Sequence, residues 1–124
     1  MPRSESARLS TRAKGNRFEK RVEAQLEAIG LYVIRSEKSR GVADLVAIGP
    51  DTKPLLFVQC KAHCFTPPTK EWNALYTEAK RRGALAIWAR LNGDDVETYR
   101  LKGLKDPPPA DSWPWERVTI EAAN

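Results

Sequence analysis

The chain has 124 residues, of which 41% are hydrophobic and 30% charged, with 21 Lys and Arg against 16 Asp and Glu and a formal charge of +5. This length suits one domain with a single core and is too short for two. No stretch approaches the roughly 20 apolar residues that a membrane span needs, and the first residues lack the apolar core of a signal peptide. We therefore expect a soluble, cytoplasmic protein that does not bind membranes.

The positive charge is concentrated near the N-terminus. Residues 1–21 hold seven bases against two acids. Because residues 1–11 are polar and lack a hydrophobic period, we predict a flexible basic arm there, followed by a single domain at 12–124. Such clustering suits a polyanion, of which nucleic acid is the commonest, although a solvated tail explains it equally well. The candidate DNA contacts in this region are Arg3, Arg8, Arg12 and Lys14.

The first helix is predicted from residue 12 to residue 29. Its apolar stripe recurs at spacings of 4, 4 and 3 and consists of Phe18, Val22, Leu26 and Ile29. Gly30 follows as a natural stop. Glu19 lies beside the edge of the stripe, where a carboxylate can reach the end of a sheet packed beneath the helix. We treat Glu19 as a candidate catalytic residue, with an ordinary solvated glutamate as the alternative.

A short β-branched run at 31–35 predicts the first strand. The polar segment that follows reads S-E-K-S-R-G and leads directly into the next apolar run. A basic loop at this place suits a phosphate backbone, and Ser39 adds a hydroxyl group. An ordinary hydrophilic connection is the alternative. The candidate DNA contacts here are Arg35, Lys38 and Arg40.

Residues 42–62 carry most of the candidate chemistry. Two short apolar runs flank a turn at residues 49–51, which predicts a β-hairpin. Side chains on a strand alternate between faces, so Gln59 and Lys61 share one face. Asp44 is the lone charge in its run, and desolvating a carboxylate there is costly unless it meets a cation. An aspartate, an amide oxygen and a lysine can therefore converge at one end of the hairpin, an arrangement that would place a divalent metal beside a phosphodiester.

The two cysteines, Cys60 and Cys64, flank His63 at the end of this hairpin. An extended strand holds residues four apart too far from each other for a disulfide. A zinc site needs a fourth ligand, and no further Cys or His lies nearby. We predict reduced thiols.

The second half of the chain adds a helix and further strands. Pro67 and Pro68 break regular structure, and Thr69 is expected to cap a helix over 70–82. Its apolar stripe suits a core better than a platform for stacking on bases; it consists of Trp72, Leu75, Tyr76 and Ala79. Residues 84–91 predict a central strand, residues 96–101 an edge strand and residues 117–120 a last short strand. Trp113 and Trp115 cover either the core or a partner subunit.

This order of elements predicts an α/β or α+β domain: a helix followed by a mixed sheet of about five strands, with a second helix packed on the sheet. The order of the candidate residues adds a resemblance. A Glu on the first helix, an Asp, a gap of about fifteen residues and then Q-x-K on the next strand resemble the PD-(D/E)xK nuclease superfamily. The resemblance implies a restriction-endonuclease-like core.

Several short segments look more narrowly like the archaeal-type Holliday-junction resolvases, which also occur in phages. They are K-G-N-R-F-E-K at 14–20, V-I-R-S at 33–36, V-A-D-L-V-A at 42–47 and V-Q-C-K at 58–61. The likeness covers about residues 14–90. The positions that match the family's active site are Glu19, Ser39, Asp44, Gln59 and Lys61. Position 59 departs from the family pattern, which generally has Glu, and Gln removes a negative charge while keeping an oxygen ligand.

The resemblance implies metal-dependent hydrolysis of DNA at a four-way (Holliday) junction, by paired symmetric nicks that serve recombination and repair. Mg²⁺, or Mn²⁺ in its place, would be held by Asp44, Gln59, Glu19 and the carbonyl of Cys60, and Lys61 would stabilise charge on the phosphate. A homodimer is implied, because two sites must cut opposed strands. The alternatives are another nuclease of this fold acting on duplex DNA, and a catalytically weakened DNA-binding module.

Overall fold

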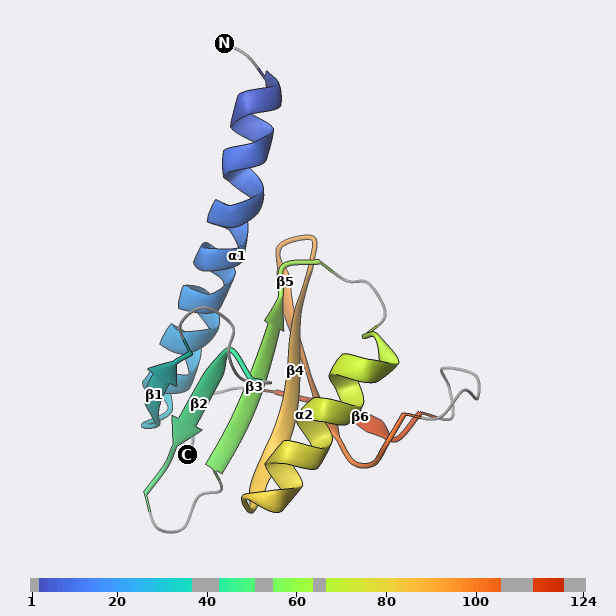
Figure 1. Cartoon of the computed structure of the whole chain (residues 1–124). Coiled ribbons are helices and arrows are strands. Elements are labelled where there is room, and N and C mark those ends of the chain that lie inside the picture. Colours follow the sequence, from blue (N-terminus) through green and yellow to red (C-terminus); the bar gives the residue numbers. More distant parts are fainter. Residues whose placement is uncertain (1–2, 37–42, 51–54, 64–66, 106–112, 120–124) are drawn as a thin grey trace.

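The computed structural model describes residues 3–36, 43–50, 55–63, 67–105 and 113–119, with side chains from residue 15 onward. Its elements are α1 (Arg3–Ala28), β1 (Tyr32–Arg35), β2 (Leu45–Ile48), β3 (Leu55–Lys61), α2 (Thr69–Arg81), β4 (Ala84–Asn92), β5 (Asp95–Leu101) and β6 (Trp115–Val118). The described strands form one sheet in chain order (Figure 1). The β3–β4 pair is parallel, with α2 as its crossover, and the other pairs are antiparallel. The predicted α/β class with a mixed sheet is confirmed.

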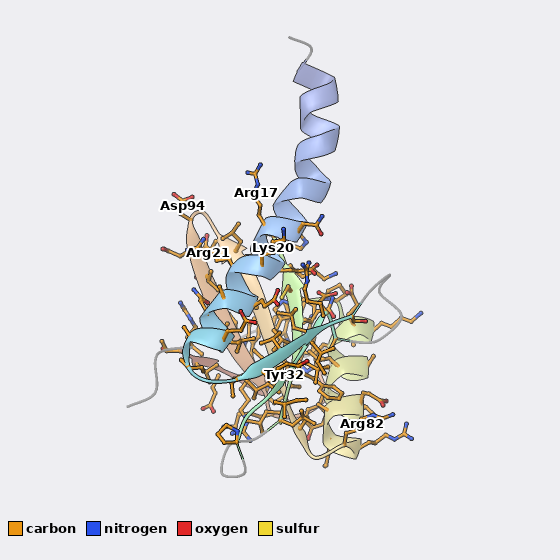
Figure 2. The ribbon with its side chains drawn as sticks, turned by 90° about the vertical axis from the view of Figure 1, so that its left-hand side faces the viewer. Arg17, Lys20, Arg21, Tyr32, Arg82 and Asp94 are labelled. Atoms are coloured by element: carbon orange, nitrogen blue, oxygen red, sulfur yellow. The ribbon has the colours of Figure 1, made fainter. Side chains whose placement is uncertain are left out.

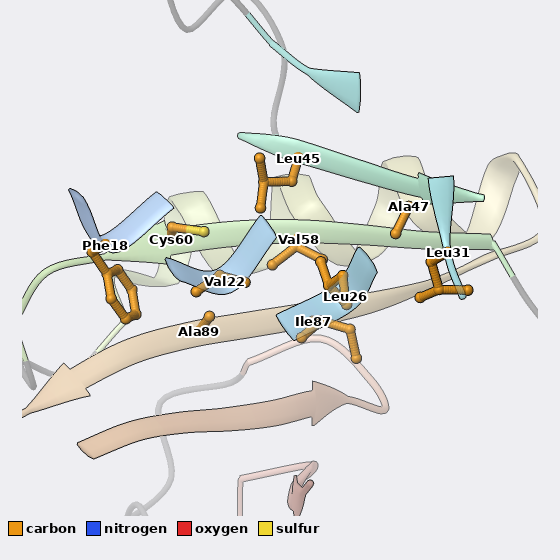
Figure 3. Close-up of a cluster of buried hydrophobic side chains, with 10 residues drawn as sticks. All are labelled: Phe18, Val22, Leu26, Leu31, Leu45, Ala47, Val58, Cys60, Ile87 and Ala89. Atoms are coloured by element: carbon orange, nitrogen blue, oxygen red, sulfur yellow. The ribbon is translucent and has the colours of Figure 1, made fainter. Parts of the chain in front are cut away.

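The two helices cover opposite faces of this sheet (Figure 1). The layer beneath α1 is shown in Figure 3 and consists of Phe18, Val22, Leu26, Leu31, Leu45, Ala47, Val58, Cys60, Ile87 and Ala89. The layer beneath α2 includes Phe57, Trp72, Leu75, Ala79 and Trp88. Successive residues of β3 enter different layers because strand side chains alternate between faces. The predicted apolar stripes of both helices are confirmed as core.

The hairpin in the middle of the chain has the predicted form. β2 and β3 pair antiparallel, with Leu45 opposite Val58.

Gly30 follows the end of α1 with a φ of 92°, a left-handed conformation that glycine adopts without strain. No described helix is both long and apolar enough to cross a membrane.

The first helix starts earlier than predicted. It begins at Arg3 instead of residue 12, so residues 3–11 of the expected arm are helical, and this part of α1 projects beyond the sheet (Figure 1). The physical reason is local, because the chain contains no glycine or proline between Arg3 and Gly15 and nothing there interrupts a helix.

The sheet and the second helix also differ in detail. β5 is not an edge strand, because β6 pairs with it on its outer side. β6 begins at Trp115 instead of residue 117 and extends the expected sheet to six described strands. Pro68 occupies the N-cap of α2 without a side-chain cap, so the predicted Thr69 cap is wrong.

The two late tryptophans lie against the core. The Trp113 and Trp115 rings have centroids 6.0 and 5.2 Å from that of the buried Trp72. Trp115 also stacks on Tyr99 at 4.2 Å. Of the two roles left open by the sequence, the structure therefore shows these rings closing the α2 layer.

The packing of α1 generates a first prediction. Leu26 is fully buried, and Leu26→Ala should lower the free energy of unfolding by about 2–5 kcal/mol through lost burial and a residual cavity. Leu104, which is 51% exposed, is the matched control, and Leu104→Ala should change stability by only about 0.5 kcal/mol. Urea denaturation measures both. Equal losses would show that α1 does not pack on the sheet as described.

Candidate active site

Asp44 stands at the end of β2, fixed by backbone hydrogen bonds to both neighbouring strands. Its N–H donates to the Val58 carbonyl at 2.9 Å, and its carbonyl accepts from the N–H of Ser36 at 2.8 Å. Its side chain is fixed as well, because Oδ2 accepts the backbone N–H of Cys60 at 2.8 Å. The carboxylate is therefore locked against β3 at the level of residues 59 and 60.

Gln59 and Lys61 share the face of β3 that α2 covers, as their spacing predicts. Phe57, two residues before Gln59, belongs to the α2 layer, whereas Cys60 belongs to the α1 layer. The Nζ of Lys61 lies 2.8 Å from Oε1 of Glu71, a residue in the first turn of α2. Lys61 thus reaches the site from the α2 side of the sheet.

Glu19 reaches the same place from the other side. Its Oε1 accepts a hydrogen bond from Nη2 of Arg35 at 3.1 Å, and Arg35 also approaches Glu23 at 3.9 Å. α1 packs on the face of β3 that carries Cys60. Glu19 and Lys61 therefore approach Asp44 from opposite faces of the sheet. Both are close enough for their charges to act on the Asp44 carboxyl at the strand end.

The surroundings of Asp44 disfavour its charged form. Burial raises the pKa of the Asp44 carboxyl above its ordinary value, against the opposing effect of the Cys60 N–H bond. The charges of Glu19 and Glu71 raise this pKa further, while Lys61 lowers it. Negative charge at Asp44 is thus incompletely compensated, which is the electrostatic condition that favours a bound cation.

Cys60 contributes its backbone to the site and not a reactive sulfur. Burial raises the pKa of the Cys60 thiol well above its ordinary value, and the nearby charges of Asp44 and Glu19 add to this effect. Burial therefore favours the protonated thiol and disfavours thiolate chemistry at Cys60.

The donors around Asp44 fit a hard divalent cation in kind. They are the Asp44 carboxylate, the amide group of Gln59, which the register places opposite Asp44, and backbone carbonyls of the same strand end; their oxygens are ligands of the type that Mg²⁺ accepts. Within the described residues, no three His, Cys, Asp or Glu side chains gather closely enough to hold a metal alone. Mg²⁺ is commonly held by one or two carboxylates together with waters and substrate phosphates, so this sparse set suits it.

The remaining candidates divide into described and undescribed residues. Ser39, Lys38 and Arg40 lie outside the described residues. Arg3, Arg8, Arg12 and Lys14 lie on α1, but their side chains are outside the described part. Arg35 is described, and it pairs with Glu19.

Glu71 was missed by the sequence analysis. The signal for it was weak, because an acid in the first turn of a helix is explained by the helix dipole alone.

A cationic surface on α1 adjoins the site end of the sheet. Arg17, Lys20 and Arg21 are exposed, and none of them forms an ion pair with another described residue. Figure 2 shows them on the part of α1 nearest the Asp94 turn, with Arg82 at the other end of the molecule. That turn follows Arg90, which pairs in register with Lys61.

The raised pKa of Asp44 predicts how its replacement affects stability. The folded state binds this proton more tightly than the unfolded state, so the favourable contribution exists at low pH and is lost as pH rises through the folded-state pKa. Asp44→Asn mimics the neutral form and still accepts the Cys60 N–H. In EDTA its Tm should exceed that of the wild type at about pH 7–8 and approach it at about pH 3.

Thermal melts across this pH range provide the measurement, with Asp94→Asn at the exposed turn as control. A Tm difference that is constant with pH would contradict the assigned surroundings of Asp44.

Comparison with solved structures finds a protein of similar fold. The chain is similar to Hjc, a Holliday junction resolvase from the archaeal hyperthermophile Archaeoglobus fulgidus, with 27% identity and a TM-score of 0.56. The match covers 68% of this chain and 70% of the resolvase. None of the protein-family models and none of the curated proteins compared with the sequence matches it. The chain therefore has the restriction-endonuclease-like fold of an archaeal Holliday junction resolvase.

Proposed function

We propose that this protein is a metal-dependent DNA endonuclease that resolves four-way junctions. The observation that supports this best is the locked Asp44 carboxylate, flanked by Lys61 and Glu19 at one strand end. The similarity to a resolvase in fold supports the substrate class. An intracellular location, a PD-(D/E)xK site and a homodimer belong to the same proposal.

The proposed reaction divides the work among the residues of the strand end. Asp44 and Gln59 would hold Mg²⁺, with the Cys60 carbonyl and Glu19 as further oxygen donors. A divalent cation, when bound, supplies Lewis-acid activation of the phosphate and of the attacking water. Lys61 places an ammonium group beside the phosphate, where negative charge develops during hydrolysis. The products would carry 5′-phosphate and 3′-hydroxyl ends.

The α1 surface provides the electrostatic part of substrate binding. Arg17, Lys20 and Arg21 present three exposed cations near the site end of the sheet (Figure 2). Contacts to phosphate oxygens fix the position of a duplex without reading its sequence. A substrate recognised by its branched shape requires binding of this kind. Two copies related by a two-fold axis would present two sites to opposed strands of a junction.

The central test is cleavage of a synthetic junction. With Mg²⁺, the wild type should nick the junction symmetrically and leave matched linear duplex intact. Asp44→Ala should abolish product while DNA affinity persists, because Asp44 would hold the cation and makes no contribution to positive charge. Denaturing gels and fluorescence anisotropy measure the two properties.

Other outcomes select the other candidate functions. Cleavage of both substrates would indicate a nuclease of this fold that acts on ordinary duplex. Salt-sensitive binding without product would indicate a DNA-binding module. Normal cleavage by Asp44→Ala would show that the site is wrongly assigned.

The α1 surface generates a separate prediction. Replacing Arg17, Lys20 and Arg21 together by Ala should weaken junction binding and flatten the slope of log K against log salt, by about 0.9 for each phosphate that the protein no longer neutralises. Replacing Arg81 and Arg82 by Ala, at the C-terminal end of α2, should leave the slope nearly unchanged. Anisotropy titrations at several salt concentrations measure both. Equal slopes for the two variants would exclude the α1 surface as the DNA-binding surface.

A further inference from the structure

The ion pair between β3 and α2 joins the proposed site to a residue that the sequence resemblance does not assign. The Nζ of Lys61 and Oε1 of Glu71 are 2.8 Å apart, and their side chains are 27% and 42% exposed. A partly exposed ion pair stabilises a folded protein little. Its position matters more, because it fixes the charged end of a flexible lysine.

Glu71 is attached to a rigid part of the molecule. The next residue, Trp72, is fully buried, and its Nε1 donates to the carbonyl of Gly103 at 2.8 Å. Glu71 itself lies in the first turn of α2, where the helix dipole favours a negative charge. The carboxylate is therefore held beside Lys61 by packing that does not involve the site.

The residue of β3 that the register places opposite Asp44 lacks the charge that Glu71 carries. The register that pairs Leu45 with Val58 brings Asp44 beside Gln59, which is neutral. Glu71 lies close enough to Asp44 for its charge to raise the pKa of the Asp44 carboxyl. After Asp44 and Glu19, Glu71 is thus a third acidic group that acts on the site, and it does so from α2 and not from β3.

We propose that Glu71 is a positioning residue of this site, which orients the Lys61 ammonium and supplies from α2 the negative charge that Gln59 does not supply from β3. This inference rests on the proposed nuclease function. It predicts that the site depends on one acidic charge at this place, and that the charge works from either element. A purely structural ion pair has no such interchangeability.

The chain contains a matched control on the same helix. Glu78 also accepts a hydrogen bond from a cation, Nε of Arg82, at 2.7 Å, and its side chain is 28% exposed. It pairs with Arg81 and Arg82 at the end of α2, and no hydrogen bond or ion pair joins it to β3 among the described residues. Glu78→Gln therefore removes a comparable ion pair without touching the site.

The experiment compares the wild type with Glu71→Gln, Glu78→Gln, Gln59→Glu and the double variant Gln59→Glu/Glu71→Gln, all in the full chain. Single-turnover junction cleavage gives the rate, anisotropy gives DNA affinity, and calorimetric titration with Mn²⁺ in the absence of DNA gives metal affinity. Thermal melts check that each variant is folded.

Glu71→Gln should slow cleavage about 10- to 100-fold through misplacement of Lys61. Its DNA affinity should be equal to that of the wild type or higher, because a negative charge is lost. Its Mn²⁺ affinity should fall about three- to tenfold. The double variant should regain most of both losses, and Glu78→Gln should match the wild type.

Two results would overturn the inference: Glu71→Gln indistinguishable from Glu78→Gln, or a double variant no better than Glu71→Gln alone. A wild type that cleaves nothing would reject the proposed function, and the Mn²⁺ titration would then decide alone. Weaker Mn²⁺ binding by Glu71→Gln with recovery in the double variant would still support the role of Glu71, and unchanged binding would refute it.

Discussion

The hydrogen bond from the backbone N–H of Cys60 to Oδ2 of Asp44 holds the candidate site together. It crosses from β3 to the end of β2 and fixes a partly buried carboxylate whose surroundings oppose its charge. Every other group of the site is placed relative to this bond: Glu19 from α1 on one face of the sheet, and Lys61 with Glu71 on the other. The site therefore forms at the end of the sheet, where charged groups from both faces lie close enough to act on Asp44.

Much of this arrangement could be predicted from the sequence, because it follows from the regular spacing of side chains along strands and helices. The alternation along β3 separates Lys61 from Cys60, and the spacing of Phe18, Val22 and Leu26 orients Glu19. What escaped prediction depends on tertiary contacts. The pairing of β6 with β5 and the approach of Glu71 to Lys61 leave no local pattern, because contacts between different elements create them. The early start of α1 is different, because its cause is local and lies in the uninterrupted run between Arg3 and Gly15.

The absence of a charge at position 59 is interpreted differently once the contact between α2 and β3 is known. In the sequence, Gln59 marks a departure from the pattern that the resemblance implies. In the fold, the carboxylate of Glu71, on α2, lies beside Lys61, two residues after Gln59 on β3. Charge near a reacting group acts through space, so the element that supplies it matters less than the distance. A sequence pattern that fixes the acid to one strand position therefore understates the ways in which such a site can be built.

The parallel pairing of β3 with β4 bears on the stage of folding at which the candidate site is completed. β1, β2 and β3 form an antiparallel meander, and we expect it to close early because few residues separate its partners. The β3–β4 contact must wait for the intervening helix to dock, since a parallel pair needs a long crossover. We therefore expect the pairing of β2 with β3, which places Asp44, to form before α2 brings Glu71 to Lys61. A chain in which α2 has not yet docked carries Asp44 and Glu19 without Glu71, and its Lys61 lacks the counterion that α2 supplies.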